Sequence, residues 1–308
     1  MLPIPALAFP KAWGKLQFMQ RKIAIFDSGV GGLTVFRQIR ARYPNDSIVY
    51  VGDTARVPYG SRSPKIICQY SEEIVRHLLT MPLSALVVGC HSSASVAVPT
   101  LQPLLHQQTP PIPLLDVLSS GVKRAAELDP EGPIAIIGTE ATIQSGRYRD
   151  ELSKIRPKLE IFPIACPLFV PLVEEGILNG AIAELVIDKY LEPIVGRVHA
   201  VMLACTHYPL LAEVIQDYLG PDVELIDPAE AVALDLELQL SPSSSGARES
   251  LFQVTDHPQR FDRIARQFLG EEIPFAELIS VSQPVIYSQD DTSSTGSTGK
   301  RVGPISRA

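Results

Sequence analysis

The amino-acid sequence predicts an α/β protein built from two doubly wound parallel sheets, and three observations support this prediction. Segments with strand character alternate with segments of helical periodicity along most of the chain. The pattern of the first half begins again in the second half. Two apolar runs, residues 86–89 and 201–204, each end abruptly at a cysteine that is followed by polar residues. Alternating strands and helices are typical of a parallel sheet with helices on both faces.

In the first half, each expected strand is a short apolar run, and the first helix follows a glycine-rich turn. The expected strands are residues 21–26, 47–51 and 85–89. The expected helices are residues 33–43, 64–80 and 94–105. In the second of these helices, Ile67, Ile74, Val75 and Leu78 recur on one face, which predicts that this face packs against the protein interior.

In the second half, the same alternation predicts strands at residues 133–137, 159–164 and 200–204. The helices expected there are residues 145–152, 168–177, 180–192 and 210–219. A helix that ends near residue 240, a strand over residues 250–255 and a helix over residues 258–269 follow. We therefore expect a first α/β domain of residues 21–115 and 228–287, and a second α/β domain of residues 116–227.

A weak internal repeat relates the two halves. The run Ile23–Phe26 begins the first half and the run Ile134–Ile137 begins the second. Cys90 lies 67 positions after Ile23, and Cys205 lies 71 positions after Ile134. Both cysteines therefore fall at the carboxyl end of a strand, where open α/β sheets bind ligands. If the domains face each other about a pseudo-twofold axis, the two thiols converge on one cleft and can act as bases on the two sides of one carbon.

Composition limits the classes of function. The 308 residues carry a formal net charge of −7, which argues against a nucleic-acid partner or an anionic membrane surface. No apolar run reaches the roughly 18 residues that cross a bilayer. The four cysteines lack metal-ligand spacing and no signal peptide precedes them, so we expect free thiols in a cytoplasmic protein without a metal site. Residues 1–20 are expected to be a flexible extension and residues 288–308 a disordered tail.

Two loops after strands have the composition of ligand-binding turns. The segment Asp27–Gly32 opens a helix, and its glycines allow the backbone to approach a ligand closely while the helix start offers free N–H groups to a carboxylate. It is not the dinucleotide-binding fingerprint. The segment Gly52–Gly60 ends in Pro-Tyr-Gly, a turn that can present a backbone amide and a phenol. A purely structural βα turn and an ordinary loop are the alternative interpretations.

Together these motifs make the chain resemble the cofactor-independent glutamate racemases. The matching segments are 26–32, 52–60, 137–146, 166–174 and 204–209, and they fall within residues 22 to about 270. Aspartate and hydantoin racemases share the fold and the cysteine pair, but they generally lack the Pro-Tyr-Gly motif and the motif around Cys205. The resemblance implies two flavodoxin-like domains with the substrate glutamate between them, no cofactor, a homodimer and a role in supplying D-glutamate for peptidoglycan.

The resemblance also implies a two-base transfer of the Cα proton. It assigns Cys90 to D-glutamate and Cys205 to L-glutamate, with Asp27 beside the first thiol and His207 and Glu174 beside the second. Glu175, next to Glu174, is the alternative carboxylate. A free thiol has a pKa of about 8.5 and is mostly protonated at neutral pH, so each thiol needs such a neighbour. The residues matched to substrate binding are Asp27, Ser28, Tyr59, Gly60, His91, Ser92, Thr206 and His207.

Two segments depart from the family pattern. One is Ser119-Ser120-Gly121, where the family usually has Glu-Pro-Gly, and it is interpreted as structural. The other follows the first cysteine. The first cysteine of the family is normally followed by Asn-Thr, whereas His91 and Ser92 follow Cys90 here. Ser92 can supply the hydroxyl, but His91 is bulkier than asparagine and can carry charge. Two other interpretations therefore stay open: a racemase of another acidic amino acid such as aspartate, and a weakly catalytic regulatory protein that binds glutamate.

Overall fold

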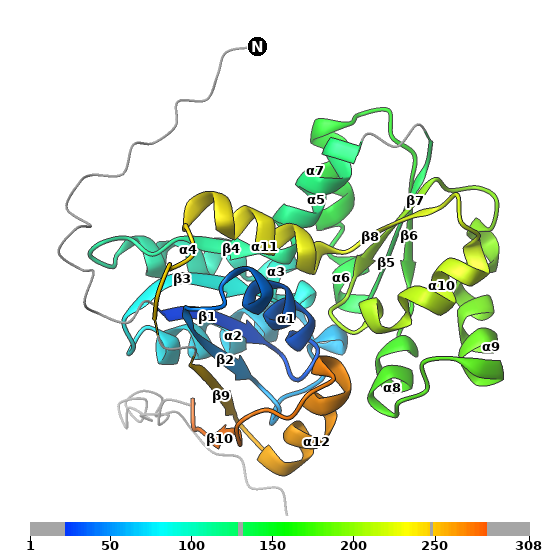
Figure 1. The fold of residues 1–308 in the computed structure, drawn as a ribbon. Helices are drawn as coiled ribbons and strands as arrows, with labels where there is room; N and C mark the ends of the chain where they lie inside the picture. Colours follow the sequence, from blue (N-terminus) through cyan, green and yellow to red (C-terminus); the bar gives the residue numbers. More distant parts are fainter. Residues whose placement is uncertain (1–21, 129–131, 247–248, 282–308) are drawn as a thin grey trace, which may run out of the picture.

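The computed structural model describes residues 22–128, 132–246 and 249–281 (Figure 1). The expected N-terminal extension, residues 1–20, and the expected tail, residues 288–308, lie outside these residues. The described chain forms two parallel sheets with helices packed around them, as the alternation of strands and helices predicts. None of its helices is both long enough and apolar enough to span a membrane.

The first sheet has six parallel strands in the order β10-β9-β2-β1-β3-β4. These strands are β1 (Lys22–Asp27), β2 (Ser47–Gly52), β3 (Leu83–Val88), β4 (Leu114–Asp116), β9 (Ser250–Val254) and β10 (Glu277–Leu278). The helices between them are α1 (Leu33–Arg42), α2 (Pro64–Leu78), α3 (His91–Val96), α4 (Val98–His106) and α12 (Pro258–Leu269). We call this sheet with these helices the first lobe. Its central strands β1 and β2 are buried almost throughout, which explains their continuous apolar runs.

The second sheet has four parallel strands in the order β6-β5-β7-β8. These strands are β5 (Ile134–Gly138), β6 (Ile161–Ala165), β7 (Ala200–Ala204) and β8 (Glu224–Ile226). The helices between them are α6 (Glu140–Gln144), α7 (Arg147–Ile155), α8 (Phe169–Glu174), α9 (Gly180–Leu191) and α10 (Ala212–Leu219). We call this part the second lobe. The chain passes between the lobes through α5 (Val117–Leu128) and α11 (Pro228–Gln239), which pack against each other.

The two sheets share one topology. The order β2-β1-β3-β4 in the first lobe matches the order β6-β5-β7-β8 in the second, so the internal repeat of the sequence corresponds to a structural repeat. This order is flavodoxin-like, and the predicted fold class is confirmed. In each lobe the winding direction reverses between the first and third strands, and ligands bind at such reversal points in open α/β sheets.

Several elements differ from the sequence-based expectation. The helix expected over residues 94–105 is two helices, α3 and α4, because Pro99 near the start of α4 cannot donate the backbone hydrogen bond that a continuous helix needs. The helix expected over residues 145–152 is α7, which begins at Arg147 after Gly146, whose φ is 66°. The short strands β4, β8 and β10 and the helices α5 and α6 were not predicted.

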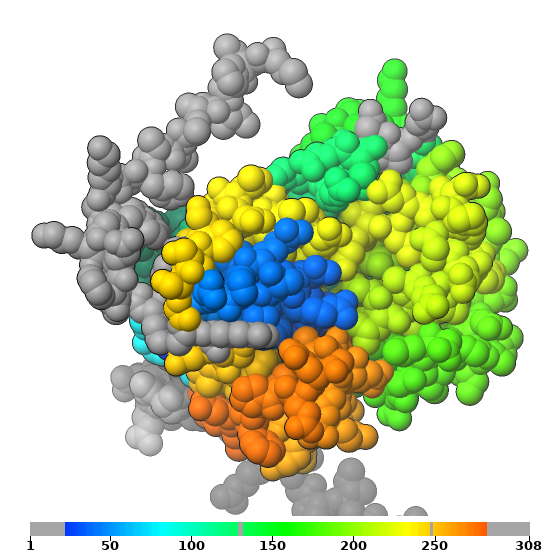
Figure 2. Space-filling view, in the orientation of Figure 1, coloured from blue at the N-terminus to red at the C-terminus, as the bar shows by residue number. Residues whose placement is uncertain are grey.

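Two glycines lie where the lobes approach most closely. A Cβ atom on Gly31 would lie 2.2 Å from Oγ1 of Thr206, and one on Gly60 would lie 2.7 Å from Cβ of Thr139. The Thr34 hydroxyl reinforces the first contact, because it lies 3.0 Å from the carbonyl oxygens of both Gly31 and Thr206. Figure 2 shows the two lobes packed together, with the orange surface of α12 adjoining the green second lobe. Glycine is therefore needed at both positions to let the lobes meet.

Candidate active site

A cavity of about 410 Å³ lies between the lobes, at the carboxyl ends of the strands on either side of the two reversal points. Its lining comprises Ser28, Gly29, Val57, Pro58, Tyr59, Gly60, Ser61, Cys90, His91, Ser92, Thr139, Glu140, Pro167, Val170, Pro171, Glu174, Cys205, Thr206 and His207. None of these lining residues is a lysine or an arginine. Besides the carboxylates of Glu140 and Glu174 and the imidazoles of His91 and His207, the polar groups of the lining are hydroxyls, the backbone and two thiols.

The structure brings the sequence-predicted site residues together. The predicted residues that line the cavity are Ser28, Tyr59, Gly60, Cys90, His91, Ser92, Glu174, Cys205, Thr206 and His207. Asp27 is not part of the lining, because it ends β1 and is buried, with only 1 % of its surface exposed. Cys90 comes from the first lobe just after β3, and Cys205 comes from the second lobe just after β7. Two thiols at equivalent positions of the repeat therefore face one cavity.

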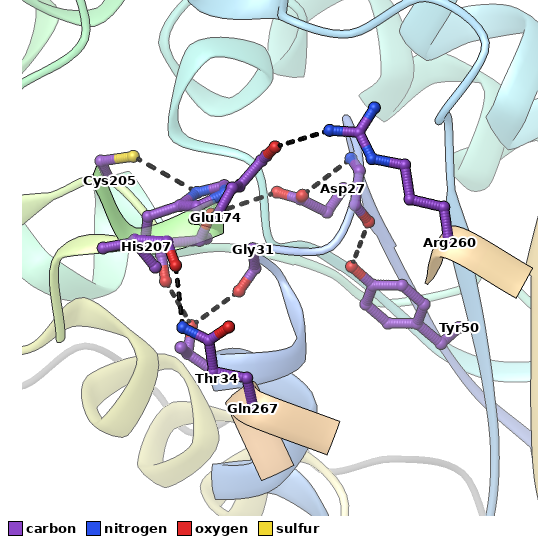
Figure 3. A network of polar contacts seen from close by, with 12 residues as sticks. Asp27, Gly31, Thr34, Tyr50, Glu174, Cys205, His207, Arg260 and Gln267 are labelled. Atoms are coloured by element: carbon purple, nitrogen blue, oxygen red, sulfur yellow. Dashed lines mark hydrogen bonds and ion pairs between the residues drawn. The ribbon is translucent and has the colours of Figure 1, made fainter. Parts of the chain in front are cut away.

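A chain of polar contacts leads from Cys205 to the protein surface (Figure 3). Nδ1 of His207 lies 3.9 Å from the Cys205 sulfur, and Nε2 of His207 lies 3.2 Å from Oε1 of Glu174. The Arg260 guanidinium on α12 donates to Oε2 of the same carboxylate across the lobe boundary at 3.5 Å. The hydrogen bond with His207 is the main cause that lowers the pKa of Glu174, so this carboxylate is ionised at neutral pH.

Asp27 is held beneath the cavity by neutral donors. Its Oδ1 accepts the backbone N–H of Gly29 at 2.9 Å, and the Thr206 hydroxyl lies 3.5 Å from its Oδ2. The Tyr50 hydroxyl fixes the same turn by donating to the Gly29 carbonyl at 2.7 Å. Burial raises the pKa of Asp27, and the nearby His207 partly offsets this rise. A carboxylate with a raised pKa is a stronger base than an exposed one.

Both cavity thiols are shifted towards their protonated form. Burial raises the pKa of Cys90 and of Cys205, and the negative charge of Asp27 raises both further. Hydrogen bonds act in the opposite direction: the backbone N–H and the hydroxyl of Ser93 favour the Cys90 thiolate, and the backbone N–H of His207 favours the Cys205 thiolate. Both thiols are therefore protonated at neutral pH, and a cation bound beside them would favour the thiolate.

Three hydroxyl groups form a cluster on one wall of the site. Oγ of Ser92 lies 3.1 Å from Oγ1 of Thr139 and 3.5 Å from Oγ1 of Thr142, and the two threonine hydroxyls are 3.0 Å apart. Sequence reasoning proposed Ser92 for this site but not the two threonines. The internal repeat contained a signal for Thr139, because this residue follows β5 as Ser28 follows β1.

The phenol of Tyr59 forms a hydrogen bond within the first lobe. Although Tyr59 lines the cavity, only 1 % of its surface is exposed and its hydroxyl donates to Oδ2 of Asp53. Asp53 in turn accepts from Arg56 at 2.6 Å and from Thr255 at 2.7 Å. The Pro-Tyr-Gly turn can therefore offer its backbone to a ligand, while the phenol holds the turn in place.

His91 lines the cavity as an uncharged side chain. The residue is 4 % exposed, and its Nδ1 lies 2.7 Å from the hydroxyl of Tyr148 on α7 of the second lobe. Burial lowers the pKa of His91 to about 3, so the ring is neutral at physiological pH. The expectation that this histidine can carry charge does not hold in the folded protein. Sequence reasoning missed Tyr148, because nothing in the local pattern linked α7 to residue 91.

Comparisons with known proteins agree with this geometry. Residues 34–236 match the family model described as Asp/Glu/Hydantoin racemase. The glutamate racemase of Aquifex aeolicus is 43 % identical over 252 residues, which cover 82 % of this chain and 95 % of that protein. The glutamate racemase of Syntrophus aciditrophicus is 40 % identical over 266 residues, which cover 84 % of this chain and 96 % of that protein.

A solved structure gives the same relationship in three dimensions. The crystal structure of glutamate racemase from Francisella tularensis, in complex with D-glutamate, superposes with a TM-score of 0.79 at 33 % sequence identity. The match covers 85 % of this chain and 98 % of the other.

Proposed function

The chain belongs to the Asp/Glu/hydantoin racemase family as a glutamate racemase, and we propose that Cys90 and Cys205 interconvert L-glutamate and D-glutamate without a cofactor. One observation carries this mechanism. The two thiols come from different lobes, at equivalent ends of β3 and β7, and line one cavity. A substrate Cα held between them can lose its proton to the thiolate of one lobe, and the planar carbanion that forms can receive a proton from the thiol of the other lobe.

The proton transfers balance without any further reagent. With L-glutamate bound, the Cys205 thiolate takes the Cα proton, and the electron pair of the C–H bond is left on Cα and its carboxylate. The Cys90 thiol then gives its proton to the opposite face of Cα and becomes the thiolate. The product is D-glutamate, and the reverse reaction begins from the Cys90 thiolate. Exchange of protons with solvent returns the enzyme to its starting state.

Each thiol has a neighbour suited to accept its proton. His207 is in contact with the Cys205 sulfur and is oriented by the ionised Glu174 on its other nitrogen. Asp27 lies near enough to Cys90 to raise the pKa of that thiol by its charge, and its own raised pKa makes it a stronger base. The ammonium group of bound glutamate adds a positive charge beside both sulfurs and favours the thiolate.

Neutral donors hold the substrate. Because the lining contains no lysine or arginine, the hydroxyls of Ser28, Ser92 and Thr206 and the backbone N–H groups of the surrounding turns bind the two carboxylates. Such donors, fixed before the substrate arrives, stabilise the charge that spreads onto the α-carboxylate when Cα loses its proton. The buried setting strengthens each of these contacts.

Glutamate is the substrate that the relatives favour. The curated relatives at about 40 % identity are named glutamate racemases, and the Francisella structure contains D-glutamate. In cells that build peptidoglycan, the reaction supplies the D-glutamate of the wall. A cytoplasmic location fits the four free cysteines. The homodimer implied by the resemblance stays a prediction that size-exclusion chromatography with light scattering can test.

The proposal is tested with purified protein in deuterated buffer without added cofactor. L-glutamate is expected to yield D-glutamate that carries deuterium at Cα, followed by NMR and chiral chromatography. A parallel reaction with L-aspartate tests the alternative substrate, and the variant Cys90→Ser/Cys205→Ser serves as the inactive control. Racemisation of aspartate but not glutamate, or binding of glutamate without exchange of its Cα proton, would contradict the proposal.

A further inference from the structure

The contact between His91 and Tyr148 crosses the lobe boundary at the cavity wall. Nδ1 of His91, from the start of α3, lies 2.7 Å from the Tyr148 hydroxyl on α7, and the two rings are nearly parallel at an interplanar angle of 23°. Both side chains are buried, with 4 % and 2 % of their surfaces exposed. Tyr148 is not part of the cavity lining, so it can act on a ligand only through His91.

The surroundings decide which atom donates in this contact. Among the described residues, the Tyr148 hydroxyl has one acceptor besides His91, the Val117 carbonyl at 3.5 Å, and this distance is beyond the usual range for an O–H donor. If Nδ1 of His91 carried the proton, the phenol would be left with a buried O–H group and no good acceptor. The phenol therefore donates to Nδ1, and in the neutral ring the remaining proton is on Nε2.

The proton on Nε2 has no partner in the described part of the protein. The hydrogen bonds of His91 that involve described residues use Nδ1 and the backbone carbonyl, which accepts from Ser95 at 2.7 Å. His91 lines the cavity, and Nδ1 of its ring is taken by Tyr148. In an imidazole ring the N–H bond of Nε2 is directed away from Nδ1. An N–H donor is thus available on a residue that lines the cavity and that follows Cys90 directly in sequence.

We propose that Tyr148 is a positioning residue that holds His91 as the Nε2–H tautomer, and that this N–H group binds a carboxylate of the substrate. The inference rests on the proposed racemisation of glutamate and adds a specificity-determining pair to it. An asparagine at position 91 would offer its own amide N–H without any such partner. Tyr148 is therefore required only while a histidine occupies position 91.

The test is a comparison of Tyr148→Phe in two backgrounds. In the natural protein this change is expected to lower kcat/KM for glutamate about tenfold, the usual effect of losing one hydrogen bond to a charged group. In a His91→Asn background the same change is expected to alter kcat/KM by less than about twofold. An equal loss in both backgrounds, or no loss in either, would overturn the proposal.

Two further measurements separate this proposal from the proposed function and from loss of folding. Tyr43→Phe also removes a buried phenol, which donates to the Leu240 carbonyl outside the cavity lining, and it is expected to leave kcat/KM unchanged. The ¹⁵N spectrum of labelled histidines reports the His91 tautomer without any activity. A proton on Nδ1 of His91 would refute the proposed role of Tyr148, even if the protein is an active racemase. Absence of racemisation with a proton on Nε2 would instead count against the proposed function.

Discussion

Nδ1 of His207 lies 3.9 Å from the sulfur of Cys205, two residues earlier on the loop that follows β7. Nε2 of the same imidazole contacts one carboxylate oxygen of Glu174, and the other oxygen accepts from Arg260 of the opposite lobe (Figure 3). A thiol, an imidazole, a carboxylate and a guanidinium thus form a continuous line from the cavity to the surface. The contacts behind one thiol therefore come from both lobes.

Replacement of Glu174 by glutamine tests this line of contacts. The amide cannot carry the charge that stabilises a protonated His207, so we expect kcat to fall about 10- to 100-fold while the protein stays folded. Initial rates from both enantiomers of glutamate, with thermal unfolding alongside, provide the measurement. An unchanged kcat would contradict a role for Glu174.

Two neighbouring changes serve as controls for Glu174→Gln. Glu175 is exposed beside it, so Glu175→Gln is expected to change kcat by less than about twofold. Arg260→Gln removes an ion pair whose arginine side chain is 59 % exposed, and we expect an effect of similarly small size because solvent screens such pairs. If either control matched Glu174→Gln, the special position of Glu174 would be refuted.

Asp27→Asn is expected to increase stability and reduce activity. The pKa of Asp27 is raised by burial, so its ionised form destabilises the folded state at any pH well above the ordinary carboxyl pKa of 3.8. Asparagine can still accept from the Gly29 N–H and avoids the buried charge. We expect a higher melting temperature at pH 7.5 together with a racemisation rate about 100-fold lower. Retention of full activity would rule out Asp27 as the base beside Cys90.

The raised pKa values of the two cavity thiols predict that the protein loses stability at alkaline pH. Burial raises the pKa of both above the ordinary value of 9.0, so their contribution to stability is complete below about pH 9 and is lost as the pH rises towards the folded-state values. Above pH 9, each thiol should lower the free energy of unfolding by up to about 1.4 kcal/mol per pH unit. Urea unfolding between pH 8 and 10 should therefore show a steeper decline for the natural protein than for Cys90→Ser/Cys205→Ser. Parallel declines would contradict these shifts.

Gly31→Ala tests the close approach of the lobes. The added methyl group would lie 2.2 Å from Oγ1 of Thr206 and 2.5 Å from Nδ1 of His207, so the loop that carries Cys205 must move. We expect about 1–3 kcal/mol of destabilisation and a loss of kcat/KM of about 100-fold, because small displacements of catalytic groups are costly. Urea unfolding and racemisation assays measure the two effects. Full activity in this variant would contradict the expected displacement of Cys205 by the added methyl group.

The sequence predicts the fold better than it predicts the contacts within the site. Strict alternation of strands and helices and the repeat that begins at Ile23 and Ile134 are enough to predict two similar parallel sheets, and the strand orders agree. The strands β4, β8 and β10 could not be predicted, because two or three residues are too few to show a hydrophobic period. The helix α5 differs from these strands, because Leu118, Val122 and Ala125 recur on one buried face and form a helical pattern in the sequence.

Within the site, residues that follow strands are predictable and those that support them are not. Cys90, Cys205 and His207 fall at strand ends that share one edge of each sheet, and so their convergence could be expected. Tyr148 and Arg260 lie on helices whose partners are 57 and 86 positions away in sequence, and a single sequence carries no signal for such contacts. The charge state of His91 was equally hidden, because it depends on burial.

The measurement that tests the two-thiol mechanism most directly is one-sided deuterium exchange in single cysteine variants. In deuterated buffer, Cys205→Ala is expected to exchange the Cα proton of D-glutamate only, and Cys90→Ala that of L-glutamate only, with racemisation abolished in both. The physical reason is that each remaining thiolate reaches one face of Cα and returns deuterium to that same face. Exchange of the same enantiomer by both variants, or continued racemisation by either, would contradict the assignment of one thiol to each face.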